Sequence, residues 1–190
     1  EKKRGKDAPG QARLSFEQPS PCVISLDAEG YIRKREMKRR PRDEEEGSVF
    51  VTNGIVYALG DDGRFYSRER AGIPDASTKK LLPAQEFFGA GEGVSLVLVS
   101  PDDHDEALFV FADGSVKRAS LDTLKGDTSR KNTSKTATPL NEGERLLAVV
   151  PLKGDGDFDI MLCTKSGRAI RIPGAKIPLK GTAARGVAGI

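Results

Sequence analysis

The chain has 190 residues, of which 37% are hydrophobic and only 6% aromatic, with no Trp. This composition is thin for one large core and favours small sheets that each bury a few aliphatic residues against a neighbour. The net charge of +3 is only a mild indication of an anionic partner. No apolar run approaches the ~20 residues that span a bilayer. Because the chain begins at Glu1 without Met or a signal peptide, we expect part of a longer intracellular protein.

Four segments share one pattern, in which an apolar run and a short polar turn with Gly are followed by an alternating run that carries basic residues. They are Val23–Lys34, Ile55–Ser67, Ala107–Arg118 and Ile160–Arg171. Each pattern predicts a β-hairpin, because Gly at the turn adopts positive φ and β-branched residues fit a pleated surface. For Asp62-Gly63 and Asp113-Gly114 we expect two-residue turns in which both residues have positive φ.

A second element recurs between the hairpins, namely an acidic residue and Gly followed by an apolar strand. It occurs at residues 46–51, 92–99 and 142–150. The hairpin glycines are 33, 51 and 53 residues apart, and the last two spacings are close to those of a four-stranded propeller blade. The sequence therefore predicts an all-β disc over 21–190, preceded by a basic arm over 1–20. Its repeats are expected near 21–54, 55–106, 107–158 and 159–190, the last incomplete.

Positive charge recurs just beyond each hairpin glycine. Seven of the ten residues from Arg33 to Arg42 are basic, and residues 160–190 contain six basic residues and no acidic one. Residues 117–135 add six basic residues against two aspartates. In a repeat architecture such residues lie at equivalent sites around a ring. Repeated cations of this kind indicate contact with the phosphates of a nucleic acid. Such phosphate contacts do not distinguish one base sequence from another.

Other chemistry finds little support in the sequence. His104 is the sole histidine and is expected at the surface, and Asp155 to Asp159 lacks the closing glutamate of a calcium loop, so we predict no metal site. Tyr31, Tyr57 and Tyr66 lie on predicted strands and are interpreted as packing residues, so no catalytic residue is predicted. Cys22 and Cys163 belong to no metal-binding motif. Two buried free thiols are the favoured interpretation, with a disulfide left open.

Five short motifs occur along the chain in a fixed order. They are Gly30-Tyr-Ile-Arg-Lys, Ile73-Pro-Asp-Ala, Gly114-Ser-Val-Lys-Arg, Lys165-Ser-Gly-Arg-Ala-Ile-Arg and Ala184-Arg-Gly-Val-Ala-Gly-Ile. In these motifs and their order, residues 20 to 190 resemble a known family, the C-terminal domains of bacterial type IIA topoisomerase A subunits, from DNA gyrase or topoisomerase IV.

The resemblance implies a β-pinwheel, a disc whose blades exchange strands and whose basic rim wraps duplex DNA without catalysis. It implies a cytoplasmic, nucleoid-associated A2B2 enzyme that uses ATP and magnesium outside this chain, through an ATPase B subunit together with the rest of the A subunit. The Gln-Arg-Arg-Gly-Gly-Lys-Gly box of gyrase has no copy here, which leaves gyrase and topoisomerase IV both open. The alternative function is a protein-interaction scaffold. The predicted DNA-binding residues are Arg33, Lys34, Arg35, Lys38, Arg39, Arg40, Arg42, Arg64, Lys117, Arg118, Arg130, Lys131, Arg168, Arg171, Lys176, Lys180 and Arg185.

Overall fold

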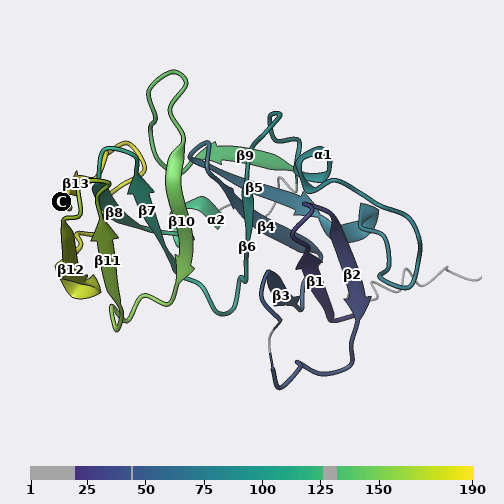
Figure 1. The fold of residues 1–190 in the computed structure, drawn as a ribbon. Helices are drawn as coiled ribbons and strands as arrows, with labels where there is room; N and C mark the ends of the chain where they lie inside the picture. Colours follow the sequence, from purple (N-terminus) through teal and green to yellow (C-terminus); the bar gives the residue numbers. More distant parts are fainter. Residues whose placement is uncertain (1–19, 44, 126–131) are drawn as a thin grey trace, which may run out of the picture.

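The computed structural model describes residues 20–43, 45–125 and 132–190, which form four antiparallel sheets in chain order (Figure 1). We call these sheets blades 1 to 4. Blade 1 has the strand order β2-β1-β3 and blade 2 the order β6-β4-β5-β9. Blade 3 has the order β10-β7-β8-β13, and blade 4 is the hairpin β11-β12. The all-β fold predicted from the sequence is thereby confirmed.

The strands are short, as expected for blades. Those of blades 1 and 2 are β1 (Cys22–Leu26), β2 (Ile32–Glu36), β3 (Ser48–Val51), β4 (Ile55–Gly60), β5 (Arg64–Glu69), β6 (Leu96–Val99) and β9 (Thr133–Thr136). Those of blades 3 and 4 are β7 (Glu106–Phe111), β8 (Ser115–Ser120), β10 (Leu146–Leu152), β11 (Asp159–Cys163), β12 (Ala169–Pro173) and β13 (Val187–Ala188).

Helical structure in the described residues is limited to single turns. These are η1 (Arg70–Gly72), α1 (Ala84–Phe88), α2 (Asp122–Lys125) and η2 (Gly174–Lys176). No helix in this part of the chain is long and apolar enough to cross a membrane.

All four hairpins have the same turn. The N–H of Gly30, Gly63, Gly114 or Gly167 donates to the carbonyl three residues earlier, and each of these glycines has φ between 73° and 86°. The hairpins are therefore confirmed. The expected positive φ at Asp62 and Asp113 is wrong, because every positive φ among the described residues belongs to Gly. A type I turn followed by a left-handed Gly needs only one such residue.

Each of blades 1 to 3 is completed by a segment from the following repeat. The carbonyl of Gly30 accepts the N–H of Ala84, while Gly63 O accepts that of Ala137 and Gly114 O that of Gly189. As a result β9, from the third repeat, pairs with β5 in blade 2, and β13, from the fourth, pairs with β8 in blade 3. In blade 1 the same position is taken by residues 74–84, which form isolated bridges with Tyr31 and with Lys34 of β2 and no regular strand. This is the strand exchange that the resemblance implied.

Three apolar clusters lie between successive blades. Along β4, Val56 and Ala58 pack toward blade 1, whereas Tyr57 and Leu59 pack toward blade 3. The third cluster joins blade 3 to blade 4, with Leu108 and its neighbours facing the β11–β12 hairpin. Because side chains alternate across a strand, the central blades are buried on both faces.

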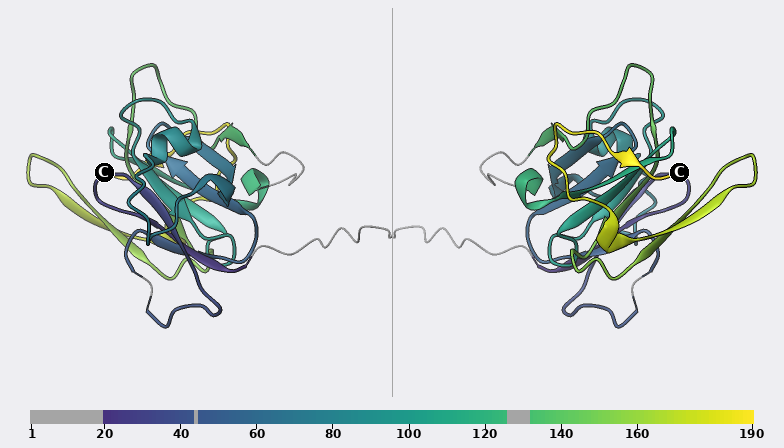
Figure 2. Two further views of the ribbon diagram at one scale, coloured as in Figure 1. Left: turned by 90° about the vertical axis from the view of Figure 1, so that its right-hand side faces the viewer. Right: turned by 90° about the vertical axis from the view of Figure 1, so that its left-hand side faces the viewer.

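The strand order distinguishes an inner from an outer edge of each blade. β6 contacts β3 and β10, so the edge strands β3, β6 and β10 lie together on the inner side. The opposite edges, formed by residues 74–84, β9 and β13, make up the outer rim. The β11–β12 hairpin extends away from the other sheets (Figure 2), and its outward face is exposed at Met161 and Cys163.

The cysteine prediction is only half correct. Both thiols are free and Cys22 is buried, but Cys163 is exposed. Cys163 lies on the outward face of β11, and none of the described residues forms a sheet over that face.

Candidate nucleic-acid interface

The basic residues predicted from the sequence differ widely in accessibility. Those that are exposed are Arg35, Lys38, Arg39, Arg40, Arg42, Arg64, Arg168, Arg171 and Lys176. Those that are half-buried are Arg33, Lys34, Arg118, Lys180 and Arg185. Lys117 is buried, and Arg130 and Lys131 lie outside the described residues. The exposed set is densest in and after β2, on the outer side of blade 1.

Two further cations, absent from the predicted set, lie in the segment that is hydrogen-bonded to β2. Lys79 and Lys80 are exposed and belong to the segment 74–84 from the second repeat. That segment is hydrogen-bonded to β2 through Lys34 N–H to Pro74 O and Ile32 N–H to Leu82 O, both at 2.9 Å. The outer edge of blade 1 is thus built from two repeats. Strand exchange, which the resemblance implied, assigns the segment with this Lys-Lys pair to the preceding blade, so the two lysines could have been predicted for the edge of blade 1.

Lys117 departs from its expected position on the rim. Its side chain is fully buried, and its ammonium donates to the carbonyls of Ala137, Gly181 and Ala184 at 3.4, 3.3 and 2.7 Å. It also lies 5.5 Å from the ring centroid of Phe109, within the range of a cation–π contact. Burial lowers the pKa of Lys117 to about 8. This ammonium joins segments that are far apart in the sequence, and no phosphate can reach it without unfolding.

Several arginines of the rim are paired with carboxylates. Arg118 contacts Glu106 at 3.0 Å and Arg185 contacts Glu144 at 2.8 Å, while Arg171 pairs with Asp159 across blade 4. Arg185 chiefly, with the backbone N–H of Asn141, lowers the pKa of Glu144 to about 2. These pairs reduce the net positive charge of blades 3 and 4. In blade 1, by contrast, Lys38, Arg39 and Arg42 pair with no carboxylate of the described residues.

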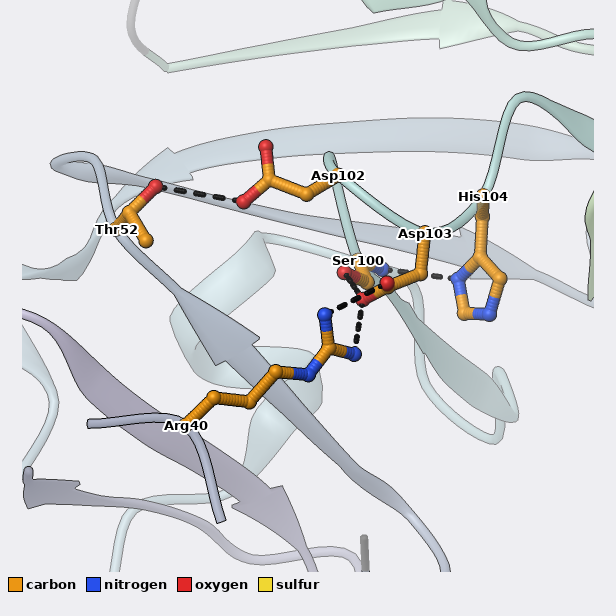
Figure 3. Close-up of polar contacts among 6 residues, drawn as sticks. All are labelled: Arg40, Thr52, Ser100, Asp102, Asp103 and His104. Atoms are coloured by element: carbon orange, nitrogen blue, oxygen red, sulfur yellow. Dashed lines mark hydrogen bonds and ion pairs between the residues drawn. The ribbon is translucent and has the colours of Figure 1, made fainter. Parts of the chain in front are cut away.

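Arg40 connects the basic loop of residues 37–43 to the turn between β6 and β7. Its guanidinium donates to both carboxylate oxygens of Asp103, at 2.8 and 2.6 Å (Figure 3). The hydroxyl of Ser100 donates to the same carboxylate, and the Ser100 N–H donates to Nδ1 of His104. Arg40 chiefly, with Ser100, lowers the pKa of Asp103 to about 2. His104, expected at the surface, is half-buried.

Tyr57 and Tyr66 are buried and act as packing residues. Tyr57 stacks on Phe65 with ring centroids 5.4 Å apart, and Tyr66 packs near Phe88. The Tyr66 hydroxyl donates to Asp62, and burial together with this carboxylate raises the pKa of Tyr66. Tyr31 is half-buried at the end of the first hairpin. Among the described residues, no cluster of three or more His, Cys, Asp or Glu could hold a metal ion.

Hairpin blades completed by strands from the next repeat define the fold as a β-pinwheel of the propeller class. The family model described as the DNA gyrase C-terminal domain, beta-propeller, matches residues 105–153 and 159–190. The resemblance to the C-terminal domain of a type IIA topoisomerase A subunit is thereby confirmed.

Individual relatives agree with this result. The chain is 28% identical over 192 residues to the A subunit of DNA gyrase from Chlamydia trachomatis serovar D, covering 88% of this chain and 22% of that protein. Among solved structures, the C-terminal domain of DNA topoisomerase IV has a TM-score of 0.69 at 17% identity, covering 89% of this chain and 56% of the other. The E. coli ParC C-terminal domain has a TM-score of 0.60 at 18% identity, covering 88% and 71%. The chain thus spans about a fifth of its full-length gyrase relative.

Proposed function

We propose that this chain binds duplex DNA on the outer edge of its blades and curves it, as a non-catalytic domain of a type IIA topoisomerase A subunit. The observation that carries the DNA binding in this proposal is the group of exposed cations on blade 1. Lys38, Arg39 and Arg42 are there without carboxylate partners in the described residues, and the exposed Lys79 and Lys80 belong to the segment that is hydrogen-bonded to β2. Such an array neutralises phosphates and releases counterions, which favours binding irrespective of sequence.

In this proposal the enzyme's other parts supply the chemistry. The rest of the A subunit would hold the DNA-cleaving tyrosine, while a B subunit in an A2B2 assembly would hydrolyse ATP with magnesium. The protein would act on the nucleoid in the cytoplasm. Bending 20–30 base pairs costs on the order of 1–6 kcal/mol. Cations on several blades could offset that cost along a continuous path, whereas a single patch could not.

We expect duplex-DNA affinity to depend steeply on salt. If ~6–10 phosphates are neutralised, the affinity should fall about 10³–10⁵-fold between 50 and 200 mM salt. Fluorescence anisotropy with labelled duplexes of unrelated sequence would measure this, and the duplexes should bind alike. A flat salt response, or no binding at 50 mM, would favour the protein-interaction scaffold instead.

We expect the chain alone to leave DNA covalently intact. Tyr57 and Tyr66 are buried, and the described residues contain no cluster of three or more His, Cys, Asp or Glu that could hold a metal ion. Supercoiled plasmid incubated with the chain, magnesium and ATP should show no protein–DNA adduct on a denaturing gel. An adduct that disappears on changing one of these tyrosines to Phe would contradict the non-catalytic assignment.

A further inference from the structure

The segments that complete blades 1, 2 and 3 are held in the same register. In each blade the residue after the hairpin glycine pairs with the residue one position before the one that donates to that glycine. These pairs are Tyr31 with Pro83, Arg64 with Thr136, and Ser115 with Ala188. The three segments can therefore be aligned residue by residue. Four positions before the donating residue they carry Lys80 in blade 1, Thr133 in blade 2 and Arg185 in blade 3.

The two cations at this position have different surroundings. The Arg185 guanidinium donates to both carboxylate oxygens of Glu144, at 2.9 and 2.8 Å, and its Cζ lies 5.1 Å from the ring centroid of Phe111. Asp113 is a further carboxylate, 3.8 Å from the same guanidinium. Lys80 is exposed and pairs with no carboxylate of the described residues. Because bidentate contacts between charged groups are strong, the Arg185 side chain is held in place, whereas no such contact holds Lys80.

The strand that follows Arg185 is short and exposed. β13, at the outer edge of blade 3 (Figure 1), consists of two residues, and both of them are exposed. The flanking glycines have no room for a side chain, since an added Cβ at Gly186 or Gly189 would lie within 2.8 Å of a backbone carbonyl oxygen of the third hairpin. In blade 2, by contrast, β9 forms four residue pairs with β5, and the position equivalent to Arg185 is uncharged.

Arg185 connects this short strand to the rest of the blade. Glu144 lies in the loop that leads into β10, at the opposite edge of the sheet. Phe111 ends β7, and Asp113 lies in the turn between β7 and β8. Ordering a strand costs conformational entropy that two backbone pairs with exposed side chains do little to offset. One guanidinium that contacts three parts of the receiving blade supplies the additional attraction.

We propose that Arg185 and Glu144 fasten the exchanged strand β13 to blade 3, and that Arg185, unlike Lys80, makes no contact with DNA. The contrast with Lys80 rests on the proposed function, whereas the fastening of β13 does not. The rim cation Lys180 is held separately, because its N–H donates to Arg118 O at 2.8 Å. Loosening β13 should therefore leave Lys180 in place.

Amide hydrogen exchange of this chain, followed by NMR, tests the fastening. The readout is the Gly189 N–H, which donates to Gly114 O at 3.1 Å beside the end of β13. In Arg185→Gln this amide should exchange at least about tenfold faster, because opening of the strand no longer breaks a charge-assisted contact. Glu144→Gln should have the same effect, and the double variant should exchange no faster than the faster single variant, since all three lack the same contact. The Lys180 amide should keep its wild-type rate.

Two variants at equivalent positions compare the blades in DNA binding. Lys80→Gln should lower the salt slope, which is the slope of log affinity against log salt, by about 0.9, or one phosphate contact. Its affinity at 0.1 M salt should fall roughly eightfold. Arg185→Gln should leave both quantities at their wild-type values. Lys80→Gln is also the matched control for exchange, and it should leave the rate of the Gly189 amide unchanged.

Arg185→Lys tests the contribution of the charge in a conservative change. It keeps a cation beside Glu144 but cannot form the bidentate contact. The exchange rate of the Gly189 amide should therefore lie between those of wild type and Arg185→Gln. Thermal melting of each variant checks that the fold is kept.

Two results would overturn the inference. An unchanged exchange rate for the Gly189 amide in both Arg185→Gln and Glu144→Gln would show that the pair does not hold β13. A salt slope lowered equally by Arg185→Gln and Lys80→Gln would make Arg185 a phosphate contact. If the wild-type chain shows no salt-dependent DNA binding, the proposed function fails, but the exchange experiment still decides whether β13 is fastened.

Discussion

Lys117→Ala should destabilise the fold by about 2–4 kcal/mol, because buried carbonyls lose a charged donor and a cavity replaces the lysine stem. The carbonyls belong to Ala137, Gly181 and Ala184, in the segments that complete blades 2 and 3. Losing their common donor should therefore loosen the outer strands of both blades. Equilibrium unfolding in urea would measure the change in the free energy of unfolding.

Two controls separate the causes of this loss. Lys117→Met restores much of the apolar volume but no donor, so it should recover only the packing part of the difference. Lys176→Ala changes an exposed lysine and should stay within about 0.5 kcal/mol of wild type. If Lys117→Ala leaves the free energy of unfolding unchanged and makes the salt slope of DNA binding shallower, Lys117 is a DNA contact and not a structural residue.

Neutralising the three loop cations of blade 1 should produce the largest loss of DNA affinity. In the variant Lys38→Gln/Arg39→Gln/Arg42→Gln, three phosphate contacts disappear, so the salt slope should fall by about 2.7 and the affinity at 0.1 M salt roughly 500-fold. Anisotropy titrations across a salt series would give both quantities from one experiment.

The matched comparison is a triple variant of blade 4, Lys165→Gln/Arg168→Gln/Lys176→Gln, whose three side chains are exposed. If DNA follows the rim past several blades, this variant should also lower the slope and should shorten the protected DNA in a footprint. Effects at such distant sites should add nearly independently in free energy. If only the blade 1 variant matters, a single basic patch replaces the wrapping model.

Local features of the fold could be predicted from the sequence, because each depends on a few neighbouring residues. The four hairpin glycines and the strands after Gly47, Gly93 and Gly143 lie where the pattern placed them, and these three glycines also have positive φ. The residues that pair across repeats could not be assigned from the pattern. β9 is bonded to β5 from a different repeat, and nothing local marks residues 133–136 for that strand.

The candidate interface was harder to predict, since accessibility depends on which blades flank a strand. A basic residue three positions after a hairpin glycine is half-buried in blade 1, at Arg33, but fully buried in blade 3, at Lys117. Blade 3 has sheets packed on both faces, so Lys117 on β8 does not reach solvent, while its neighbour Arg118 is half-buried. Ion pairs were a second feature that the sequence did not predict, because Arg40 and Arg185 contact carboxylates that are far away in the sequence.

Strand exchange has a consequence for how such a domain can lengthen by duplication. The sequence repeats do not coincide with the sheets. The fourth repeat supplies β13 to blade 3, and the N–H of Lys180 in this repeat donates to the carbonyl of Arg118 in blade 3. Adding a repeat at one end would therefore finish the former last sheet and leave a new one unfinished. Growth by duplication alone never removes the unpaired edge, which invites association with other chains. Closure of the last blade onto the first, or a segment that covers the open edge, would end the series.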